Sequence, residues 1–235
     1  MAVSTEEGGL SNNSELKALF LNCTLKKSPE VSNTDALIKV VADLMTAMDV
    51  ECETVRLVDY NIAYGTESDM GDGDEWPTIY EKIKAADILV PSMPIWMGVR
   101  SSPCQLMCER LDGSYRDMNA KTGQYPLYGK VVGVIVTGNE DGAHDCCSTT
   151  LYNFTHYGCT VPPNADCYWV GDAGPGPSYI EAGQGHLYTN RTARFLAHGA
   201  VWMAKMLKEH GPIEVNLIKL TEEAQKVSRD TAPAG

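Results

Sequence analysis

The chain has 235 residues, of which 43% are hydrophobic, so it is long enough to bury a full core as one domain rather than two small ones. Its 31 acidic and 19 basic residues give a net charge of −12, which opposes general binding to nucleic acid or to an anionic membrane. We therefore expect a small-molecule ligand or a basic partner protein.

Several further sequence features exclude other classes of protein. No apolar run approaches the roughly 20 residues that cross a bilayer, and the opening "MAVSTEEGGL" lacks the pattern of a signal peptide, so we expect a cytoplasmic protein. A core of this size needs no disulfide staples, so we interpret the eight cysteines as reduced thiols. Cys104 and Cys108 would share one side of a helix, but no further ligand lies nearby at zinc spacing, and we predict no metal site.

Apolar runs that fit strands alternate along the chain with periodic patterns that fit helices. The predicted strands are residues 16–21, 52–58, 87–92 and 130–138, with a weaker one at 167–170. The predicted helices are residues 34–48, 76–85, 101–111, 144–157 and 188–209. The strands are continuously apolar, which is typical of parallel strands buried on both faces. We therefore predict an α/β fold with a doubly wound, three-layer parallel sheet.

Ligands of such sheets bind beyond the carboxyl ends of the strands, and the first loop there is "NCTLKKSPEVSNT", residues 22–34. It leads into a helix N-terminus, where free N–H groups and the helix dipole favour an anion. It lacks the glycine patterns of dinucleotide and Walker sites. Instead it offers hydroxyl, amide and ammonium groups that suit a terminal phosphate, at Thr24, Lys26 or Lys27, Ser28, Ser32, Asn33 and Thr34. An ordinary N-cap at Asn33 or Thr34 with a solvated loop is the alternative.

The second loop, within "PSMPIWMGVRSSPCQLMCER" (91–110), places Trp96 just past a buried strand. A Trp that is followed closely by Gly98 provides a flat surface and a close backbone approach, which suit a planar aromatic ligand. The alternative is a core aromatic. The third loop, "TGNEDGAHDCCSTT" (137–150), frees backbone N–H groups at Gly138 and Gly142 for the polar edge of a heterocycle. His144 could donate there too, although a lone His at this position also fits a simple helix start.

Together these stretches resemble the NADPH-dependent FMN reductase branch of the flavodoxin-like family, over residues 16 to about 205. That family has a G-S-x-R-x-x-S-x-T type phosphate loop, a P-[IV]-[YW]-x-G-x-x-[SP] segment along the flavin, and a T-G-x-x-x-G loop at the other edge of the ring. This chain departs from the pattern in the first loop, where Asn-Cys and lysines replace Gly-Ser and Arg. It also lacks the compact four-cysteine motif of the iron-sulfur flavoproteins with the same fold.

The resemblance implies FMN as cofactor and NAD(P)H as cosubstrate, with specific residues around the flavin. The phosphate would be held by Thr24, Lys26, Ser32, Asn33 and Thr34. The isoalloxazine would be lined by Pro94, Ile95, Trp96, Met97 and Gly98, and its pyrimidine side would be closed by Thr137, Gly138, Asn139, Asp141, Gly142 and His144. It also implies a flavodoxin-like FMN-binding domain at 15–211, between a flexible arm at 1–14 and a polar C-terminal tail at 212–235 that lacks a core pattern.

Because a flavin itself carries hydride and electrons, no catalytic side chain is required. We predict an oxidoreductase that passes electrons from NAD(P)H to a small acceptor, such as a quinone, a nitro or azo compound, free flavin or a metal ion. The alternatives are a flavodoxin-type electron carrier between proteins and a regulatory module that has lost its ligand. The sequence does not choose between NADPH and NADH.

The long Gly/Pro-rich segment at 161–190 favours the reductase over the carrier. With Tyr168, Trp169 and Tyr179, it could cover the flavin edge that a minimal carrier leaves open. A surface excursion or an oligomer contact is the alternative. The family resemblance further implies a homo-oligomer, either a dimer or a tetramer, for which Trp76, Trp169 and Trp202 are candidate contacts.

Overall fold

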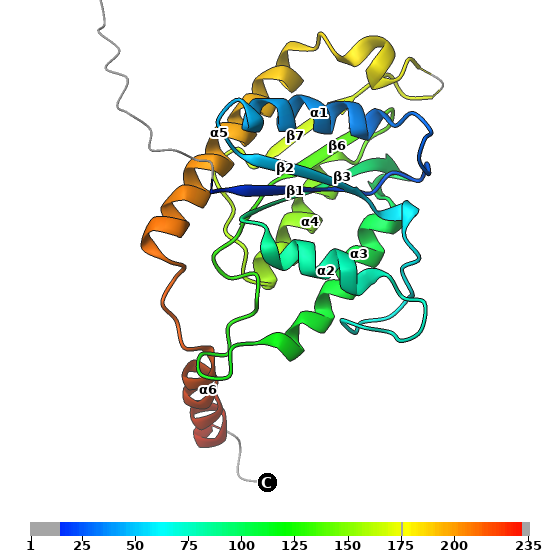
Figure 1. Ribbon diagram of the computed structural model, residues 1–235. Coiled ribbons are helices and arrows are strands. Elements are labelled where there is room, and N and C mark those ends of the chain that lie inside the picture. The colour runs from blue at the N-terminus through cyan, green and yellow to red at the C-terminus, as the bar shows by residue number, and fades with distance from the viewer. Residues whose placement is uncertain (1–14, 175, 232–235) are drawn as a thin grey trace, which may run out of the picture.

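The computed structural model, which describes residues 15–174 and 176–231, is organised around a seven-stranded sheet (Figure 1). The predicted flexible arm at 1–14 lies outside the described residues. The main strands, in spatial order, are β2 (Glu51–Arg56), β1 (Lys17–Asn22), β3 (Ile88–Trp96), β6 (Val134–Gly138) and β7 (Asp166–Val170). These strands run parallel. The short β5 (Val131–Val132) pairs in parallel with β3, and β4 (Val99–Arg100) turns back antiparallel to it.

Helices cover both faces of this sheet. One face carries α1 (Asn33–Thr46) and α5 (Leu187–His210), and the other carries α2 (Trp76–Ala85), α3 (Ser102–Asp112) and α4 (Ala143–His156). Single-turn helices lie at Leu57–Asp59, Gly113–Asp117 and Tyr179–Gly183. The prediction of a doubly wound, three-layer α/β fold is confirmed, and the order of the main strands is the 2-1-3-4-5 order of flavodoxin-like sheets.

The continuous apolar character of the strands follows from burial on both faces. In β1, Leu19 and Leu21 pack in the core under α2, α3 and α4, whereas Ala18 and Phe20 pack in the core under α1 and α5. The predicted strand at 130–138 is interrupted at Gly133, because α5 approaches closely there. A Cβ at Gly133 would lie 2.2 Å from Leu196 Cδ1.

The C-terminal segment holds a helix that the reading as a polar tail did not anticipate. Helix α6 spans Leu217–Thr231 and stands apart from the sheet at the lower end of Figure 1. Its composition is mostly polar. Four of its apolar residues, Leu217, Leu220, Ala224 and Val227, share one side of the helix, whereas Ile218 lies on another.

The acidic loop "DMGDGDEW" (69–76) is tied to the core by one ion pair. Arg110 donates to both carboxylate oxygens of Asp74, at 3.0 and 2.6 Å, and both side chains are buried. Burial alone would raise the pKa of Asp74, but hydrogen bonds from Arg110 and from the N–H groups of Met70, Ala63 and Trp76 outweigh it and hold that pKa well below its usual range. Asp74 therefore has a structural role and anchors the loop, whereas Asp69 and Asp72 of the same loop are exposed.

Replacing Asp74 with Asn leaves a buried guanidinium without its counter-charge, and we expect a loss of about 3 to 5 kcal/mol in the free energy of unfolding at neutral pH. Urea unfolding measures it, with the exposed Asp72→Asn as the matched control. Because the folded pKa of Asp74 is depressed, its contribution is complete above the unfolded pKa of about 3.9 and is lost as the pH falls towards the folded value. The difference between wild type and Asp74→Asn should therefore narrow below about pH 4. A difference under 1 kcal/mol at neutral pH would contradict the assignment.

Candidate functional site

The loops at the carboxyl ends of β1, β3 and β6 meet in one cleft of about 560 Å³. The segment after β7 forms a further wall. The lining residues are Thr24, Leu25, Lys26, Asn33, Thr34, Pro94, Ile95, Trp96, Thr137, Gly138, Asn139, Glu140, Trp169, Gly174, Gly176 and Tyr179. Segments that lie more than 100 residues apart in the chain thus share one site, as expected where a parallel sheet reverses its strand order.

One end of the cleft is the N-terminus of α1. The Ser32 hydroxyl caps this helix by accepting a hydrogen bond from the N–H of Asp35 at 3.1 Å, and the Ser32 carbonyl accepts one from Ala36. The remaining N–H groups of the first turn belong to Asn33 and Thr34, which line the cleft. With the positive end of the helix dipole, they suit an anion.

A pair of buried hydroxyls lies beside these N–H groups. The Oγ1 atoms of Thr34 and Thr137 are 2.9 Å apart, and both side chains line the cleft. A hydroxyl has one hydrogen to donate, so one Thr donates to the other and the second keeps its hydrogen for a ligand.

Residues that the sequence analysis did not identify stabilise the conformation of the loop before α1. The fully buried Asn22 accepts from the N–H of Thr24 at 3.1 Å and donates to Asp35 at 3.0 Å. Arg56, which is paired with Asn22 in the register of β1 and β2, donates to the Glu30 carbonyl at 2.9 Å and forms an ion pair with Asp35 at 3.4 Å. No local motif reveals such partners, because the register of neighbouring strands brings them together.

The outer part of the same loop is tied to the segment after β2. The Ser28 hydroxyl and N–H both donate to Asp59, at 2.6 and 2.9 Å, and the hydroxyl is the main reason that the pKa of Asp59 is lowered. Ser28 therefore contributes to the shape of the loop and not to the cleft lining.

The loops after β3 and β6 are pressed together, backbone against backbone. Gly142 has a φ of +125°, and a Cβ there would lie 2.2 Å from the Gly98 carbonyl oxygen. Glu140 also accepts a hydrogen bond from the N–H of Met97 at 3.0 Å. Trp96 stays 52% exposed at the rim of the cleft, so it is a surface platform and not a core aromatic.

Most of the predicted site residues line the cleft in the structure, and six do not. Ten line the cleft: Thr24, Lys26, Asn33, Thr34, Pro94, Ile95, Trp96, Thr137, Gly138 and Asn139. The lining does not include Ser32, Met97, Gly98, Asp141, Gly142 or His144. Ser32 is the helix cap, while Gly98 and Gly142 set the loop packing. His144 instead lies with Nε2 at 3.1 Å from the Tyr168 hydroxyl, and its role towards a ligand stays a prediction.

The segment after β7, within the predicted cover at 161–190, is fastened across the cleft. Asn139 Nδ2 donates to the carbonyls of Gly176 and Pro177, at 3.3 and 3.0 Å. On the opposite side, the N–H of Ile180 donates to Asn33 Oδ1 at 3.0 Å. Trp169 and Tyr179 pack edge to face beneath it, with ring centroids 5.7 Å apart. Two cleft residues thus also hold the cover.

Charge in the cleft is sparse. Lys26 and Glu140 are the charged residues of the lining, and they come from different loops. The thiols next to His144 are buried, and burial raises the pKa of Cys146 to about 11 and that of Cys147 further. Buried thiols of this kind are not activated nucleophiles, and neither one lines the cleft. The arrangement can bind an anionic group at one end and a flat, mostly apolar body along the rest.

The two asparagine anchors can be tested by hydrogen exchange. In the double variant Asn33→Ala/Asn139→Ala the cover loses its hydrogen bonds to both sides of the cleft, so we expect amide exchange in peptides from 176–186 to become faster. Peptides from β1 serve as the internal control and should keep their rate, because core strands open only with the whole fold. If the amide exchange rate of 176–186 is unchanged in the double variant, these hydrogen bonds do not hold the cover, and side-chain packing such as that of Trp169 on Tyr179 does.

Comparisons with known proteins agree with this architecture. The family model described as NADPH-dependent FMN reductase matches residues 16–172. The 8-demethyl-8-aminoriboflavin-5′-phosphate synthase of Streptomyces davaonensis is 40% identical over 225 residues, which cover 92% of this chain and 87% of that protein. The crystal structure of RosB with bound 8-demethyl-8-formylriboflavin-5′-phosphate superimposes with a TM-score of 0.82 at 38% identity, covering 94% of this chain and 89% of that one.

A second curated relative is similar over only part of its length. The divalent metal cation transporter MntH of Mycobacterium bovis is 43% identical over 200 residues, which cover 82% of this chain. The chain spans 29% of the length of that relative. Within residues 15–174 and 176–231, none of the helices has the length and apolar character needed to cross a membrane.

Proposed function

Because the chain belongs to the NADPH-dependent FMN reductase family, we propose that its cleft binds FMN and that it is an FMN-dependent NAD(P)H oxidoreductase acting on a small acceptor. The observation that carries this proposal is that one cleft contains both the N-terminus of α1, with its free N–H groups, and the exposed Trp96 beside Pro94 and Ile95. FMN has two parts that suit these features, a single phosphate and a planar ring system.

The residues present fit this cofactor. The N–H groups of Asn33 and Thr34, the hydroxyl hydrogen left over by Thr34 and Thr137, and the Lys26 ammonium group are donors suited to one phosphate. The volume of about 560 Å³ falls in the usual range for small-molecule sites, about 300 to 1,000 Å³. The first loop carries no glycine fingerprint for a second phosphate, which favours FMN over a dinucleotide.

The flavin, when bound, supplies the hydride and electron transfer itself. The task of this chain is then to bind and orient it and to keep water away. Pro94, Ile95 and Trp96 offer an apolar wall, and the polar Asn139, whose Nδ2 is engaged by the cover, also lines the cleft. The fastened cover supports a reductase with a defined substrate pocket over an electron carrier with an open flavin edge.

A second candidate function rests on the relative from Streptomyces davaonensis, which matches nearly the whole chain and is named as a synthase of a modified riboflavin phosphate. In this reading riboflavin phosphate is the substrate that occupies the cleft, and position 8 of the ring is altered. Both functions use the same phosphate end of the cleft. They differ in whether the flavin leaves with its mass unchanged.

The phosphate end can be tested by comparing FMN with riboflavin. Lys26→Met and Thr34→Val each remove one donor from the anion site, so we expect the Kd for FMN to rise by about 5- to 150-fold, which corresponds to about 1 to 3 kcal/mol. The Kd for riboflavin, which lacks the phosphate, should change little. Quenching of flavin fluorescence on titration measures both.

Lys27→Met is the matched control, since it removes the same charge from an exposed neighbour outside the cleft lining. If Lys26→Met and Lys27→Met weaken FMN binding equally, Lys26 acts through long-range electrostatics and not through direct contact with the phosphate. If a variant weakens the binding of FMN and of riboflavin equally, the phosphate of FMN binds elsewhere.

Anaerobic stopped-flow tests the redox function. We expect NADPH or NADH to bleach the flavin absorbance of the FMN-loaded protein, and steady-state rates with a small quinone to give parallel double-reciprocal lines. Negligible bleaching by both nucleotides over minutes would end the reductase proposal. Mass spectrometry of the flavin recovered after aerobic incubation with an amino acid as amine donor separates the two candidates. Replacing a ring methyl group by an amino group needs a nitrogen source and an oxidant, and this incubation supplies both. An unchanged FMN mass under these conditions contradicts the synthase function, and a converted flavin supports it.

A further inference from the structure

The cover carries a buried tyrosine whose hydroxyl has no partner in the protein. Tyr179 is 1% exposed, and it lines the cleft. Within residues 15–174 and 176–231 its hydroxyl forms no hydrogen bond, yet it is not sealed in the interior, as the unpartnered indole nitrogen of Trp76 is. The accessible part of Tyr179 is therefore its hydroxyl, at the cleft. Buried polar groups are almost always hydrogen-bonded, so an open hydroxyl on an otherwise buried ring points to a ligand.

The ring of Tyr179 is held in place by its neighbours. Trp169, which is also buried, packs against it with an angle of 64° between the two rings. A Cβ at Gly183 would lie 2.4 Å from Tyr179 Cδ2 and 2.7 Å from Trp169 Nε1, so only a glycine lets the chain pass this close to both rings. Packing therefore fixes the direction of the hydroxyl before any ligand arrives.

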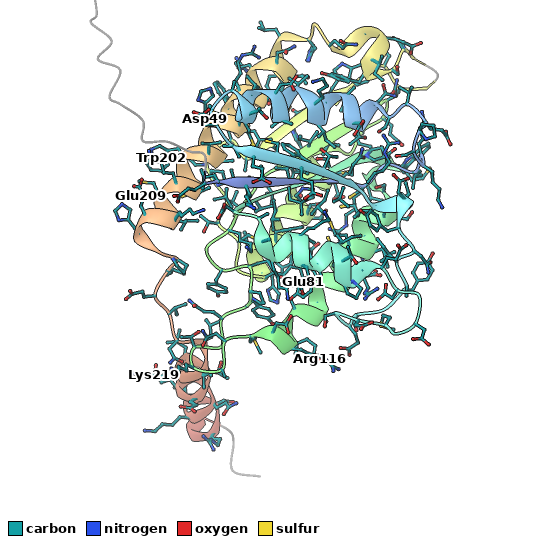
Figure 2. The ribbon with its side chains drawn as sticks, viewed as in Figure 1. Asp49, Glu81, Arg116, Trp202, Glu209 and Lys219 are labelled. Carbon is teal, nitrogen blue, oxygen red and sulfur yellow. The ribbon has the colours of Figure 1, made fainter. Side chains whose placement is uncertain are left out.

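The burial of Trp169 also corrects an expectation from the sequence. Of the three tryptophans suggested as oligomer contacts, Trp76 and Trp169 are buried, so that suggestion is wrong for them. Trp202 is exposed and lies at the outer edge of the molecule in Figure 2, and its role as a contact stays a prediction. Trp169 instead supports Tyr179 and the cover from within the chain.

Tyr179 lies at the anion end of the cleft. The N–H of the next residue, Ile180, donates to Asn33 Oδ1 at 3.0 Å, and Asn33 is the first residue of α1. The tyrosine therefore enters the cleft beside the N-terminus of that helix, where the free N–H groups lie.

The packing partner of Tyr179 leads to the same end of the cleft. Trp169 pairs with Thr137 in the register of β7 and β6, and paired residues of neighbouring strands point to the same face of the sheet. Thr137 lies with its Oγ1 atom 2.9 Å from that of Thr34, in the first turn of α1. The cover thus adds one hydroxyl to an end of the cleft that already holds the hydroxyls of Thr34 and Thr137.

The hydroxyl of Tyr179 is a hydrogen-bond donor at neutral pH. Burial raises the pKa of Tyr179 above the usual tyrosine value of about 10, so the oxygen keeps its hydrogen. Hydrogen bonds from such a donor to a charged acceptor are shorter and stronger than those to a neutral one. A phosphate oxygen is therefore an acceptor that suits this hydroxyl.

We propose that Tyr179 binds the flavin phosphate, and that through this contact the phosphate stabilises the fastened position of the cover. The inference rests on the proposed function, in the part that both candidate functions share, which is that a flavin phosphate occupies the cleft. The other phosphate donors belong to the first loop, to α1 and to β6, whereas Tyr179 belongs to the cover. A phosphate bonded to both sides links them, and a ligand stabilises the arrangement to which it binds. Tyr179 thereby selects phosphorylated flavins over riboflavin.

Tyr179→Phe tests the contact, because it removes the hydroxyl and keeps the ring. We expect the Kd for FMN to rise by about 10- to 150-fold, the usual effect of losing a hydrogen bond to a charged group, and the Kd for riboflavin to change little. Quenching of flavin fluorescence measures both values. The melting temperature of the ligand-free protein should not fall, since the hydroxyl has no partner in the protein to lose.

Tyr80→Phe is the matched control for this substitution. Tyr80 is 3% exposed and does not line the cleft. It lies on α2, which Figure 2 marks by the adjacent Glu81, on the face of the sheet opposite α1. Its loss of a hydroxyl should leave the Kd for FMN unchanged.

Hydrogen exchange tests the link between the phosphate and the cover. With each flavin at saturating concentration, FMN should slow amide exchange in peptides from 176–186 of the wild type more than riboflavin does. In Tyr179→Phe the two flavins should protect these peptides equally. A merely structural role of Tyr179 would not make the difference between FMN and riboflavin depend on its hydroxyl.

Three results would overturn the proposal while leaving flavin binding intact. They are equal FMN affinity of wild type and Tyr179→Phe, equal losses of FMN and riboflavin affinity in Tyr179→Phe, and equal protection of 176–186 by both flavins in the wild type. A wild type that does not bind FMN would overturn the proposed function and this inference together, so the two failures are told apart.

Discussion

The buried side chain of Asn22 is the contact on which the rest of the site depends. It sits at the end of β1, fully removed from solvent. Its side-chain oxygen accepts a hydrogen bond from Thr24 in the loop before α1, and its amide nitrogen donates one to Asp35 in the first turn of α1. A buried amide must be hydrogen-bonded, because each unsatisfied group costs about 1 to 3 kcal/mol. This requirement fixes where α1 begins relative to the sheet, and hence where its free N–H groups point.

Beyond Asn22, the cleft is built mainly from backbone groups. Gly142 lies against the Gly98 carbonyl, and the N–H of Met97 donates to Glu140, so the loops after β3 and β6 are packed directly on one another. The cover is fastened to Asn33 and Asn139, which are themselves part of the lining. Such a cleft suits a ligand that is recognised by its shape and by backbone N–H and carbonyl groups. This explains why so few charged or nucleophilic side chains are needed for the proposed flavin chemistry, where the cofactor reacts and the protein positions it.

The sequence by itself determined the fold class and the place of the site. Runs such as "LFLN" and "ILVPS" must be buried on both faces, so a parallel sheet covered by helices follows, and its carboxyl edge then collects the loops that contain Thr34, Trp96 and Gly138. The comparisons and the strand order agree with that reading. The exposed Trp96 also follows from a local pattern, because it comes directly after a buried strand. The helix cap does not, since the pattern suggested Asn33 or Thr34 and the structure places the cap at Ser32.

Only the tertiary structure decided which of those residues face the cleft. Asn22 and Arg56 become partners through the register of β1 and β2, and Gly98 and Gly142 meet through loops from different strands, so no local spacing reveals them. The same holds for His144, which Tyr168 engages away from the lining, and for Tyr179, which is brought to the cleft by the cover. The outward direction of α6 is likewise decided by its contacts with residues 121–124, because an amphipathic pattern encodes an apolar side but not what that side will meet.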